Sequence, residues 1–189
     1  GYQKGTFNIS TTAAFVVAGA GVTVAKHGNR SVSSQSGSAD VLGTLGVKVD
    51  APRERVERCI AQIGIGFLFA PLLHEAMKYA VQPRRDIGIR TIFNLLGPLT
   101  NPAMATHQLI GIYSGELVGL VANVLKNLGS ARAMVVHGLE GLDEISLCGP
   151  TKIAELRDGA VKEFQIEPEQ FGLKRCLLAD LHGGSAEES

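Results

Sequence analysis

Two clusters of small polar and basic residues lie near the start of the chain, with an apolar run between them. The first cluster is Thr6, Asn8, Ser10 and Thr11. The second cluster contains Lys26, His27, Asn29, Arg30, Ser31, Ser33, Ser34, Ser36 and Ser38. Hydroxyl and amide groups supply directional hydrogen bonds, and the basic side chains supply full positive charge. A multiply charged phosphate needs this mixture, so the two clusters predict a phosphate site.

The apolar run between the clusters, residues 13–24, predicts a buried helix followed by a buried strand. The first cluster then lies at a helix start, where unpaired N–H groups and a partial positive charge favour an anion. The second cluster follows the strand, as in the phosphate sites of parallel α/β sheets. Each cluster also has a simpler interpretation, because the first can be only a helix cap and the second only a solvated turn.

Two further groups of charged residues could do chemistry. Asp143 and Glu144 follow a predicted strand and a Gly-rich loop, residues 138–141. In a loop the two carboxylates can converge on a hard cation, and Mg²⁺ prefers a few carboxylates plus phosphate oxygens and water. Arg84 follows Pro83, and its guanidinium can pair bidentately with a carboxylate. The alternatives are a solvated acidic turn and an ordinary surface arginine.

Composition excludes several classes of protein. Eighteen basic residues balance eighteen acidic ones, which argues against a general nucleic-acid-binding protein. Apolar residues make up 45% of the chain, so a globular fold is expected. Residues 7–25 are uncharged over about the length of a membrane span, but their polar and glycine residues fit a buried helix and strand better. Cys59, Cys148 and Cys176 lack metal-ligand spacing and predict buried free thiols in a reducing cytoplasm.

Strands and helices alternate along the chain. Helices are predicted at residues 38–45, 51–63, 74–80, 91–96 and 116–128, and strands at residues 66–70, 107–112 and 133–137. Residues 98–102 predict an extended linker because of their two prolines. Residues 144–148, 151–156 and 160–166 predict short antiparallel strands, with a turn at residues 157–159. The expected fold is α/β: a mainly parallel sheet with helices on both faces plus a short antiparallel segment, forming one incomplete domain over residues 1–189.

Several long motifs resemble the anthranilate phosphoribosyltransferase family of tryptophan biosynthesis, in the nucleoside-phosphorylase-like class. The motifs are residues 8–11, 26–34 and 36–40, Arg84, residues 90–102 and residues 138–144. The resemblance covers essentially the whole chain. It implies Mg²⁺-dependent transfer of a phosphoribosyl group from 5-phosphoribosyl 1-diphosphate to the amino group of anthranilate, with release of pyrophosphate.

The resemblance also implies roles for individual residues. The phosphoribosyl diphosphate would contact Gly1, Thr6, Asn8, Ile9, Ser10, Thr11, Lys26, His27, Gly28, Asn29, Arg30, Ser31, Val32, Ser33, Ser34 and Ser38. Anthranilate would contact Asn29, His27, Arg84 and His74. Two Mg²⁺ ions would be held by Ser10, Asp143 and Glu144. No acid or base is assigned, because an unprotonated aromatic amine is already a nucleophile. His27 could instead be a packed structural histidine.

Family members have a small helical domain before this region and further helices after it, so the chain is expected to be a central portion with low turnover on its own. The expected setting is cytoplasmic, with small-molecule substrates, a homodimer of the full-length protein, an anthranilate synthase partner, and neither nucleic acid nor membrane. Tyr2 and Gln3 stand where the family has Asp and Gly in its diphosphate loop, which predicts weaker diphosphate binding. The alternatives are a paralogue without anthranilate activity, acting on nucleic acid or as a scaffold, and a nucleoside phosphorylase.

Overall fold

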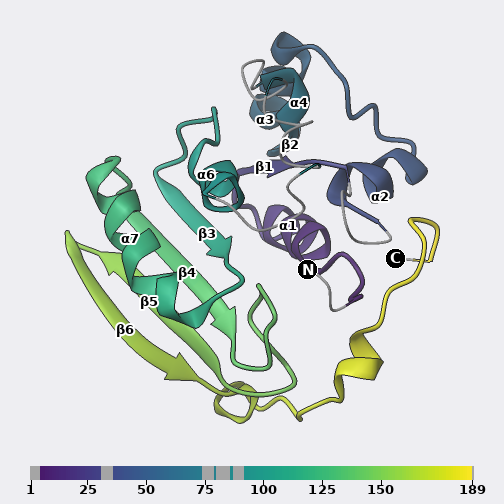
Figure 1. Cartoon of the computed structure of the whole chain (residues 1–189). Helices are drawn as coiled ribbons and strands as arrows, with labels where there is room; N and C mark the ends of the chain where they lie inside the picture. Colours follow the sequence, from purple (N-terminus) through teal and green to yellow (C-terminus); the bar gives the residue numbers. More distant parts are fainter. Residues whose placement is uncertain (1–4, 31–35, 74–78, 80–85, 87–91, 189) are drawn as a thin grey trace. The chain divides into compact units, whose positions relative to one another are not determined.

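The computed structural model describes residues 5–30, 36–73, 79, 86 and 92–188. The chain divides into two compact units (Figure 1). The two-stranded unit contains Ser10–Met104 and Ser185–Ser189, and the four-stranded unit contains Gly1–Ile9 and Ala105–Gly184.

The two-stranded unit is a small parallel α/β arrangement. Its elements are α1 (Ile9–Gly19), β1 (Val24–Gly28), α2 (Ser38–Thr44), α3 (Arg53–Ile63), β2 (Ile65–Phe69), α4 (Ala70–Leu73) and α6 (Phe93–Leu99). Strands β1 and β2 pair in parallel from Val24 opposite Ile65 to Gly28 opposite Phe69. Their carboxyl ends therefore meet at one edge of the sheet. The strand predicted within residues 13–24 was placed too early, because β1 includes Lys26 and His27 of the second polar cluster.

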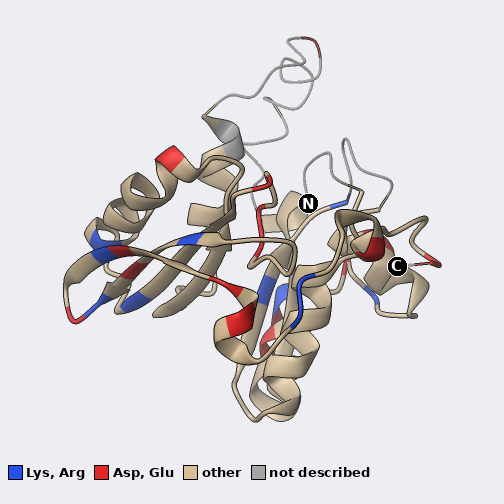
Figure 2. Ribbon diagram, turned by 90° about the horizontal axis from the view of Figure 1, so that it is seen from below, with Lys and Arg blue, Asp and Glu red and all other residues tan. Residues whose placement is uncertain are grey.

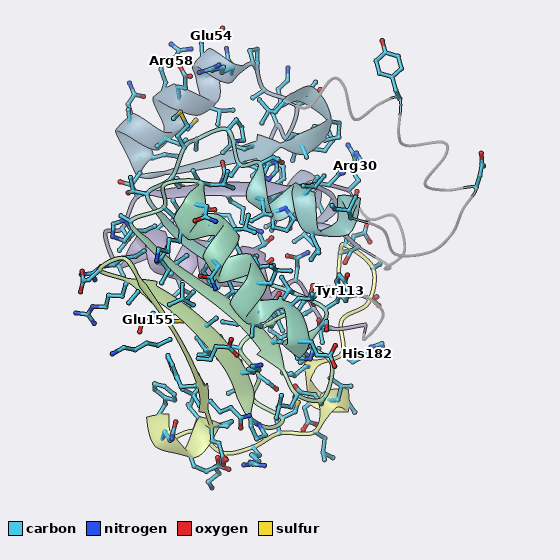
Figure 3. All side chains as sticks on the ribbon, turned by 60° about the vertical axis from the view of Figure 1, so that its left-hand side comes forward. Arg30, Glu54, Arg58, Tyr113, Glu155 and His182 are labelled. Carbon is cyan, nitrogen blue, oxygen red and sulfur yellow. The ribbon has the colours of Figure 1, made fainter. Side chains whose placement is uncertain are left out.

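Helix α3 packs closely on β2 because Gly66 lacks a side chain. A Cβ at Gly66 would meet Ile60 and Val56, which lie on the inner face of α3. The opposite face is charged, and Figure 3 shows Glu54 and Arg58 projecting outward from the helix. Gly64 ends the helix in the left-handed conformation, at φ 76°, which glycine adopts without strain. The predicted helix and strand are thus observed, each with boundaries shifted by one or two residues.

Two predictions for this unit are wrong in detail. The apolar run was expected to be buried, but Phe15 and Val16 of α1 are 44% and 67% exposed. A helix that is apolar on every side does not indicate which side is buried. The expected linker at residues 98–102 begins too early, because α6 continues through Pro98. Gly97 precedes this proline and has no Cβ to clash with its ring, so the helix tolerates it.

The four-stranded unit is a mixed sheet covered by a helix. Its elements are β3 (His107–Gly111), η2 (Gly115–Leu117), α7 (Val118–Asn127), β4 (Arg132–Gly138), β5 (Thr151–Arg157), β6 (Ala160–Ile166), η3 (Pro168–Phe171) and η4 (Leu178–Leu181). The strand order is β3-β4-β5-β6, with β3 and β4 parallel and the other two pairs antiparallel. Helix α7 packs on β4 and β5, burying Leu125 against a core that includes Val135 and Ile153 (Figure 1).

The hairpin between β5 and β6 has the predicted turn. Asp158 and Gly159 have positive φ angles of 51° and 74°, and Arg157 pairs with Ala160 across the turn. This two-residue turn has both central residues at positive φ, which matches the twist of the flanking strands. The predicted strand at residues 144–148 is absent: these residues lie in an irregular loop between β4 and β5.

A C-terminal strap, residues 172–184, returns along the four-stranded unit to the start of the chain. Phe7 N donates to Leu181 O at 2.9 Å, and Gly183 N donates to Gly5 O at 2.7 Å. Thr6 and His182 form an antiparallel bridge between these two hydrogen bonds. The strap therefore fixes the residues that lead directly into helix α1.

The α/β class predicted from the sequence is confirmed, with parallel pairing in both sheets and an antiparallel segment at β4-β5-β6. Lys and Arg residues are interspersed with Asp and Glu residues along the described ribbon (Figure 2). Among the described helices, none is both long and apolar enough to cross a membrane.

Candidate functional site

One residue from each polar cluster meets the other within the two-stranded unit. Lys26, near the end of β1, donates from Nζ to Ser10 Oγ in the first turn of α1, at 3.2 Å. Both residues are half-buried. The contact places an ammonium group beside a helix start, where the N–H groups already favour an anion. The helix start and the strand, which the sequence predicted to contribute to one site, are thus in contact through Ser10 and Lys26.

The end of β1 is packed tightly against the start of α2. A Cβ at Gly28 would lie 2.9 Å from Phe67 Cε2 and 3.1 Å from Ser38 Cβ, so only glycine fits without displacing them. Asn29 O accepts a hydrogen bond from Ala39 N at 3.1 Å. Ser38 is the first residue of α2, and Gly37 is its N-cap. These contacts hold Gly28, Asn29 and Ser38 together at one edge of the sheet.

Arg30 is oriented by an acidic residue that sequence reasoning did not single out. Its Nη1 atom donates to Asp40 Oδ1 at 3.0 Å, and its guanidinium carbon lies 5.9 Å from the centre of the Phe69 ring. The other Asp40 oxygen accepts from Gly37 N at 2.9 Å. The Arg30 side chain is 60% exposed, so this ion pair contributes little stability and serves mainly to orient the guanidinium. An acid three residues after a helix cap is the sequence signal that identifies Asp40.

The remaining residues of the clusters lie in different surroundings. Thr11 is 3% exposed, so its hydroxyl lies inside the fold. The Thr6 hydroxyl oxygen is buried and has no hydrogen-bond partner in the part of the chain that the structure describes. His27 lies in β1, paired with Leu68 of β2. Asn8 and Ile9 lie at the start of α1. The structure thus places the described members of the first cluster in the chain segment that enters α1.

Asp143 and Glu144 lie in the irregular loop after β4, as predicted. Three backbone hydrogen bonds close this loop: Gly138 N to Leu142 O at 2.8 Å, Gly141 N to Gly138 O at 2.8 Å, and Leu139 N to Pro150 O at 3.0 Å. Leu142 is fully buried, and both acidic residues after it are half-buried. The loop is therefore an anchored segment of the four-stranded unit.

Gly111, the last residue of β3, allows the Asp143 backbone to pack directly against this strand. A Cβ at Gly111 would overlap the Asp143 carbonyl oxygen and lie 2.6 Å from its carbonyl carbon. Any side chain at residue 111 would push the acidic pair out of position. Sequence reasoning did not identify this glycine, because the contact joins residues that are far apart in the chain.

A hydrogen-bonded chain supports the far side of the loop. Ser146, 3% exposed, donates its hydroxyl proton to Glu140 and accepts from Cys148 N at 2.9 Å. Ser146 N donates to Thr151 Oγ1 at 2.8 Å, and Thr151 is fully buried at the start of β5. The acidic pair is therefore held between the end of β4 and the start of β5.

The two carboxylates of Asp143 and Glu144 suit Mg²⁺ better than a metal ion whose ligands all come from the protein. Within residues 5–30, 36–73, 79, 86 and 92–188, no group of three or more His, Cys, Asp or Glu side chains could hold a metal ion. Magnesium is commonly held by one or two carboxylates together with substrate phosphates and water. Two half-buried carboxylates on an anchored loop meet that requirement.

Seven of the predicted site residues lie outside the described residues: Gly1, Ser31, Val32, Ser33, Ser34, His74 and Arg84. Tyr2 and Gln3 lie outside them as well. The anthranilate contacts predicted for Arg84 and His74 stay predictions.

The chain matches the family described as "Glycosyl transferase family, a/b domain" over residues 1–189. It is 61% identical over 189 residues to the anthranilate phosphoribosyltransferase of Moorella thermoacetica, covering 100% of this chain and 56% of that protein. It is 58% identical over 189 residues to that of Petrotoga mobilis, covering 55% of that protein. The chain therefore spans about half the length of the curated relatives it matches.

Solved structures show the same similarity. Anthranilate phosphoribosyltransferase from Thermus thermophilus superimposes with a TM-score of 0.91 at 48% identity, covering 100% of this chain and 55% of that one. The Saccharomyces cerevisiae enzyme, in complex with PRPP and Mg, gives a TM-score of 0.87 at 34% identity, covering 97% of this chain and 51% of that one. The same yeast enzyme has also been solved in complex with 4-fluoroanthranilate.

Proposed function

Because this chain belongs to the glycosyl transferase family whose α/β domain matches all of its residues, we propose that it is the phosphoribosyl-transferring portion of an anthranilate phosphoribosyltransferase. The reaction breaks the bond between C1 of the ribose and the diphosphate of 5-phosphoribosyl 1-diphosphate. A bond forms between C1 and the anthranilate nitrogen, pyrophosphate leaves, and the nitrogen releases a proton. The observation that carries the proposal is the 3.2 Å contact between Lys26 and Ser10, which joins the two polar clusters into one anion site.

The residues of the two-stranded unit would act on the diphosphate. Negative charge accumulates on this group as the C1–O bond breaks, and preorganised donors that face it lower the barrier. Lys26 supplies a full charge, the start of α1 supplies N–H groups, and Ser10 supplies a hydroxyl. Arg30 is already oriented by Asp40 and Phe69, which reduces the entropy lost when it engages a phosphate oxygen. Asn29 and His27 are proposed to face anthranilate.

Asp143 and Glu144 are proposed to hold magnesium, and Ser10 is proposed as a hydroxyl ligand of a second ion. Bound Mg²⁺ neutralises the diphosphate and favours its departure. The yeast relative solved with PRPP and Mg supports this assignment. Two ions are proposed, as the family resemblance implies. Gly111 and the Glu140–Ser146 hydrogen bond would keep the two carboxylates in place.

We infer a homodimer for the full-length protein, an anthranilate synthase partner and a cytoplasmic setting. The three free cysteines are typical of a reducing compartment, which supports the last point. Sedimentation of the full-length protein tests the dimer, and a monomer at micromolar concentration would contradict it.

The test measures Mg²⁺-dependent binding of 5-phosphoribosyl 1-diphosphate to this chain by calorimetry, together with loss of anthranilate fluorescence. The double variant Asp143→Ala/Glu144→Ala removes the proposed metal ligands. The matched control Glu54→Ala/Glu57→Ala removes two carboxylates from the exposed face of α3. Binding should require Mg²⁺, disappear in the first variant and persist in the second. Binding that ignores Mg²⁺, or that survives loss of both carboxylates, contradicts the proposal.

A further inference from the structure

Two of the three cysteines meet in the four-stranded unit, although the sequence separates them widely. The Sγ atoms of Cys148 and Cys176 lie 3.7 Å apart, and both cysteines are free thiols. The sequence prediction of free thiols is confirmed, but both are half-buried, so the predicted burial is wrong for this pair. Cys148 lies in the same β4–β5 loop as Asp143 and Glu144, and Cys176 belongs to the C-terminal strap.

Backbone hydrogen bonds hold the two cysteines side by side. Cys176 N donates to Leu147 O at 3.1 Å, which binds the strap to the loop at the residue before Cys148. Cys148 N donates to the buried Ser146 hydroxyl at 2.9 Å. These backbone contacts place the two cysteines next to each other.

We propose that Cys148 and Cys176 are a redox-active pair that forms an intramolecular disulfide by exchange with a small-molecule disulfide such as oxidised glutathione. A disulfide needs its sulfurs about 2.05 Å apart, so they must approach by about 1.7 Å from the observed 3.7 Å. Rotation of the two side chains about their Cα–Cβ bonds supplies a movement of this size. The pairing is independent of the proposed transfer reaction.

The exchange proceeds in two steps. One cysteine, as its thiolate, attacks a sulfur of oxidised glutathione, and glutathione leaves as a thiolate that takes up a proton. The other cysteine loses its proton and attacks the protein sulfur of this mixed disulfide, releasing the second glutathione. Two electrons pass from the protein thiols to the glutathione disulfide, and the protein loses two hydrogen atoms.

The surroundings of Cys148 give the exchange a pH dependence. Burial raises the pKa of the Cys148 thiol, and the hydrogen bond with Cys176 and the negative charges of Cys176 and Glu140 raise it further, against the lowering effect of Ser146. The thiolate is the reacting species, so little Cys148 thiolate is present at neutral pH. Disulfide formation should therefore accelerate as the pH rises above neutrality.

The bond would close a loop of the chain around the β5–β6 hairpin. Cys148 and Cys176 are 28 residues apart, and both strands of the hairpin lie between them. Restricting the unfolded chain in this way stabilises the folded state. The disulfide would also tie the strap covalently to the loop of the acidic pair.

The test equilibrates the purified chain in glutathione buffers from fully reduced to strongly oxidised, at about pH 7 and about pH 8.5. Remaining thiols are alkylated and counted by intact mass, and non-reduced peptides are mapped. Labels should fall from three to one, with Cys59 still labelled and one cross-linked peptide pair joining Cys148 to Cys176. Oxidation should raise the thermal midpoint by several degrees and should proceed faster at the higher pH.

Single cysteine variants serve as controls for this test. Cys59→Ser should keep the cross-link, so its labels fall from two to none. Cys148→Ser and Cys176→Ser should acquire only a mixed disulfide with glutathione and show no rise in thermal midpoint. The proposal is overturned by a cross-link that contains Cys59, by dimers joined through disulfides, or by both thiols remaining open to alkylation in excess oxidised glutathione.

Discussion

Replacing Gly111 with alanine should displace the acidic pair and weaken metal-dependent binding. The added Cβ would lie 2.6 Å from the Asp143 carbonyl carbon, whereas carbon atoms in contact prefer about 3.5 Å. The Asp143 backbone must therefore move by at least about 0.9 Å, the difference between these two distances, because its carbonyl oxygen lies closer still to the added Cβ. The clash involves backbone on both sides, so a change of rotamer does not relieve it.

Two quantities should change together. Overpacking of this kind lowers the free energy of unfolding by about 1–3 kcal/mol, measured by urea denaturation. Loss of one well-placed charged contact costs about 1.5–3 kcal/mol, so Mg²⁺-dependent binding of phosphoribosyl diphosphate should weaken by about 10- to 100-fold. Calorimetry at saturating Mg²⁺ measures the second effect.

Gly149→Ala is the matched control, because it adds the same methyl group to the same loop. Its Cβ would meet only Glu140 Oε2, at an ordinary contact distance of 3.7 Å. Stability and binding should therefore change little in this variant. If Gly111→Ala unfolds at the wild-type urea concentration and keeps its affinity, the overlap with Asp143 does not fix the acidic pair.

Three other perturbations have calculable outcomes. Lys26→Met removes the ammonium of the proposed anion site and should weaken binding of phosphoribosyl diphosphate about 10-fold or more, measured by calorimetry. Leu142→Ala leaves a cavity under the loop and should cost about 2–5 kcal/mol of unfolding free energy, whereas Leu139→Ala, at a half-exposed position, should cost less than about 1 kcal/mol. The hydrogen bond from Arg175 Nε lowers the pKa of Glu169 below its ordinary value of 4.5. This pair therefore stabilises the fold above pH 4.5 and loses its effect as the pH falls through the lowered pKa, which carboxyl NMR titration measures.

A specific result would contradict each of these three predictions. Equal loss of affinity in Lys48→Met, a control at an exposed lysine outside the site, would show that Lys26 acts only through net charge. Equal costs for the two leucine variants would mean that Leu142 does not anchor the loop. A Glu169 titration that Arg175→Gln leaves unchanged would remove the arginine as the cause of the lowered pKa.

The sequence was most informative where local pattern decides structure. The period of the apolar residues and the turn residues located β2, β3, β4, β5, β6 and α7, whereas β1 begins where the strand predicted within residues 13–24 was expected to end. The polar residues that follow apolar runs identified Lys26 and the acidic pair. Ser10 and Lys26 could be expected to meet because a helix start and a strand end share one edge of a parallel arrangement.

Long-range contacts and local exceptions could not be predicted in the same way. The meeting of Cys148 and Cys176 depends on the hairpin and on the path of the strap, and the overlap between Gly111 and Asp143 depends on the pairing of β3 with β4. The predicted strand at residues 144–148 was wrong because alternating Ile145 and Leu147 resemble a strand. In the structure, Ser146 instead bonds to Glu140 and Thr151, which fixes an irregular loop.

The strap has a consequence for the time course of synthesis. Residues 5–7 leave the ribosome more than 170 residues before their partners, residues 181–183. At about 5–20 residues per second, this delay is on the order of 10–30 s. The four-stranded unit therefore cannot complete its hydrogen bonds until the strap has been synthesised, whereas the elements of the two-stranded unit all precede residue 100. Folding on the ribosome should accordingly begin with β1 and β2 and finish with the closing of the strap.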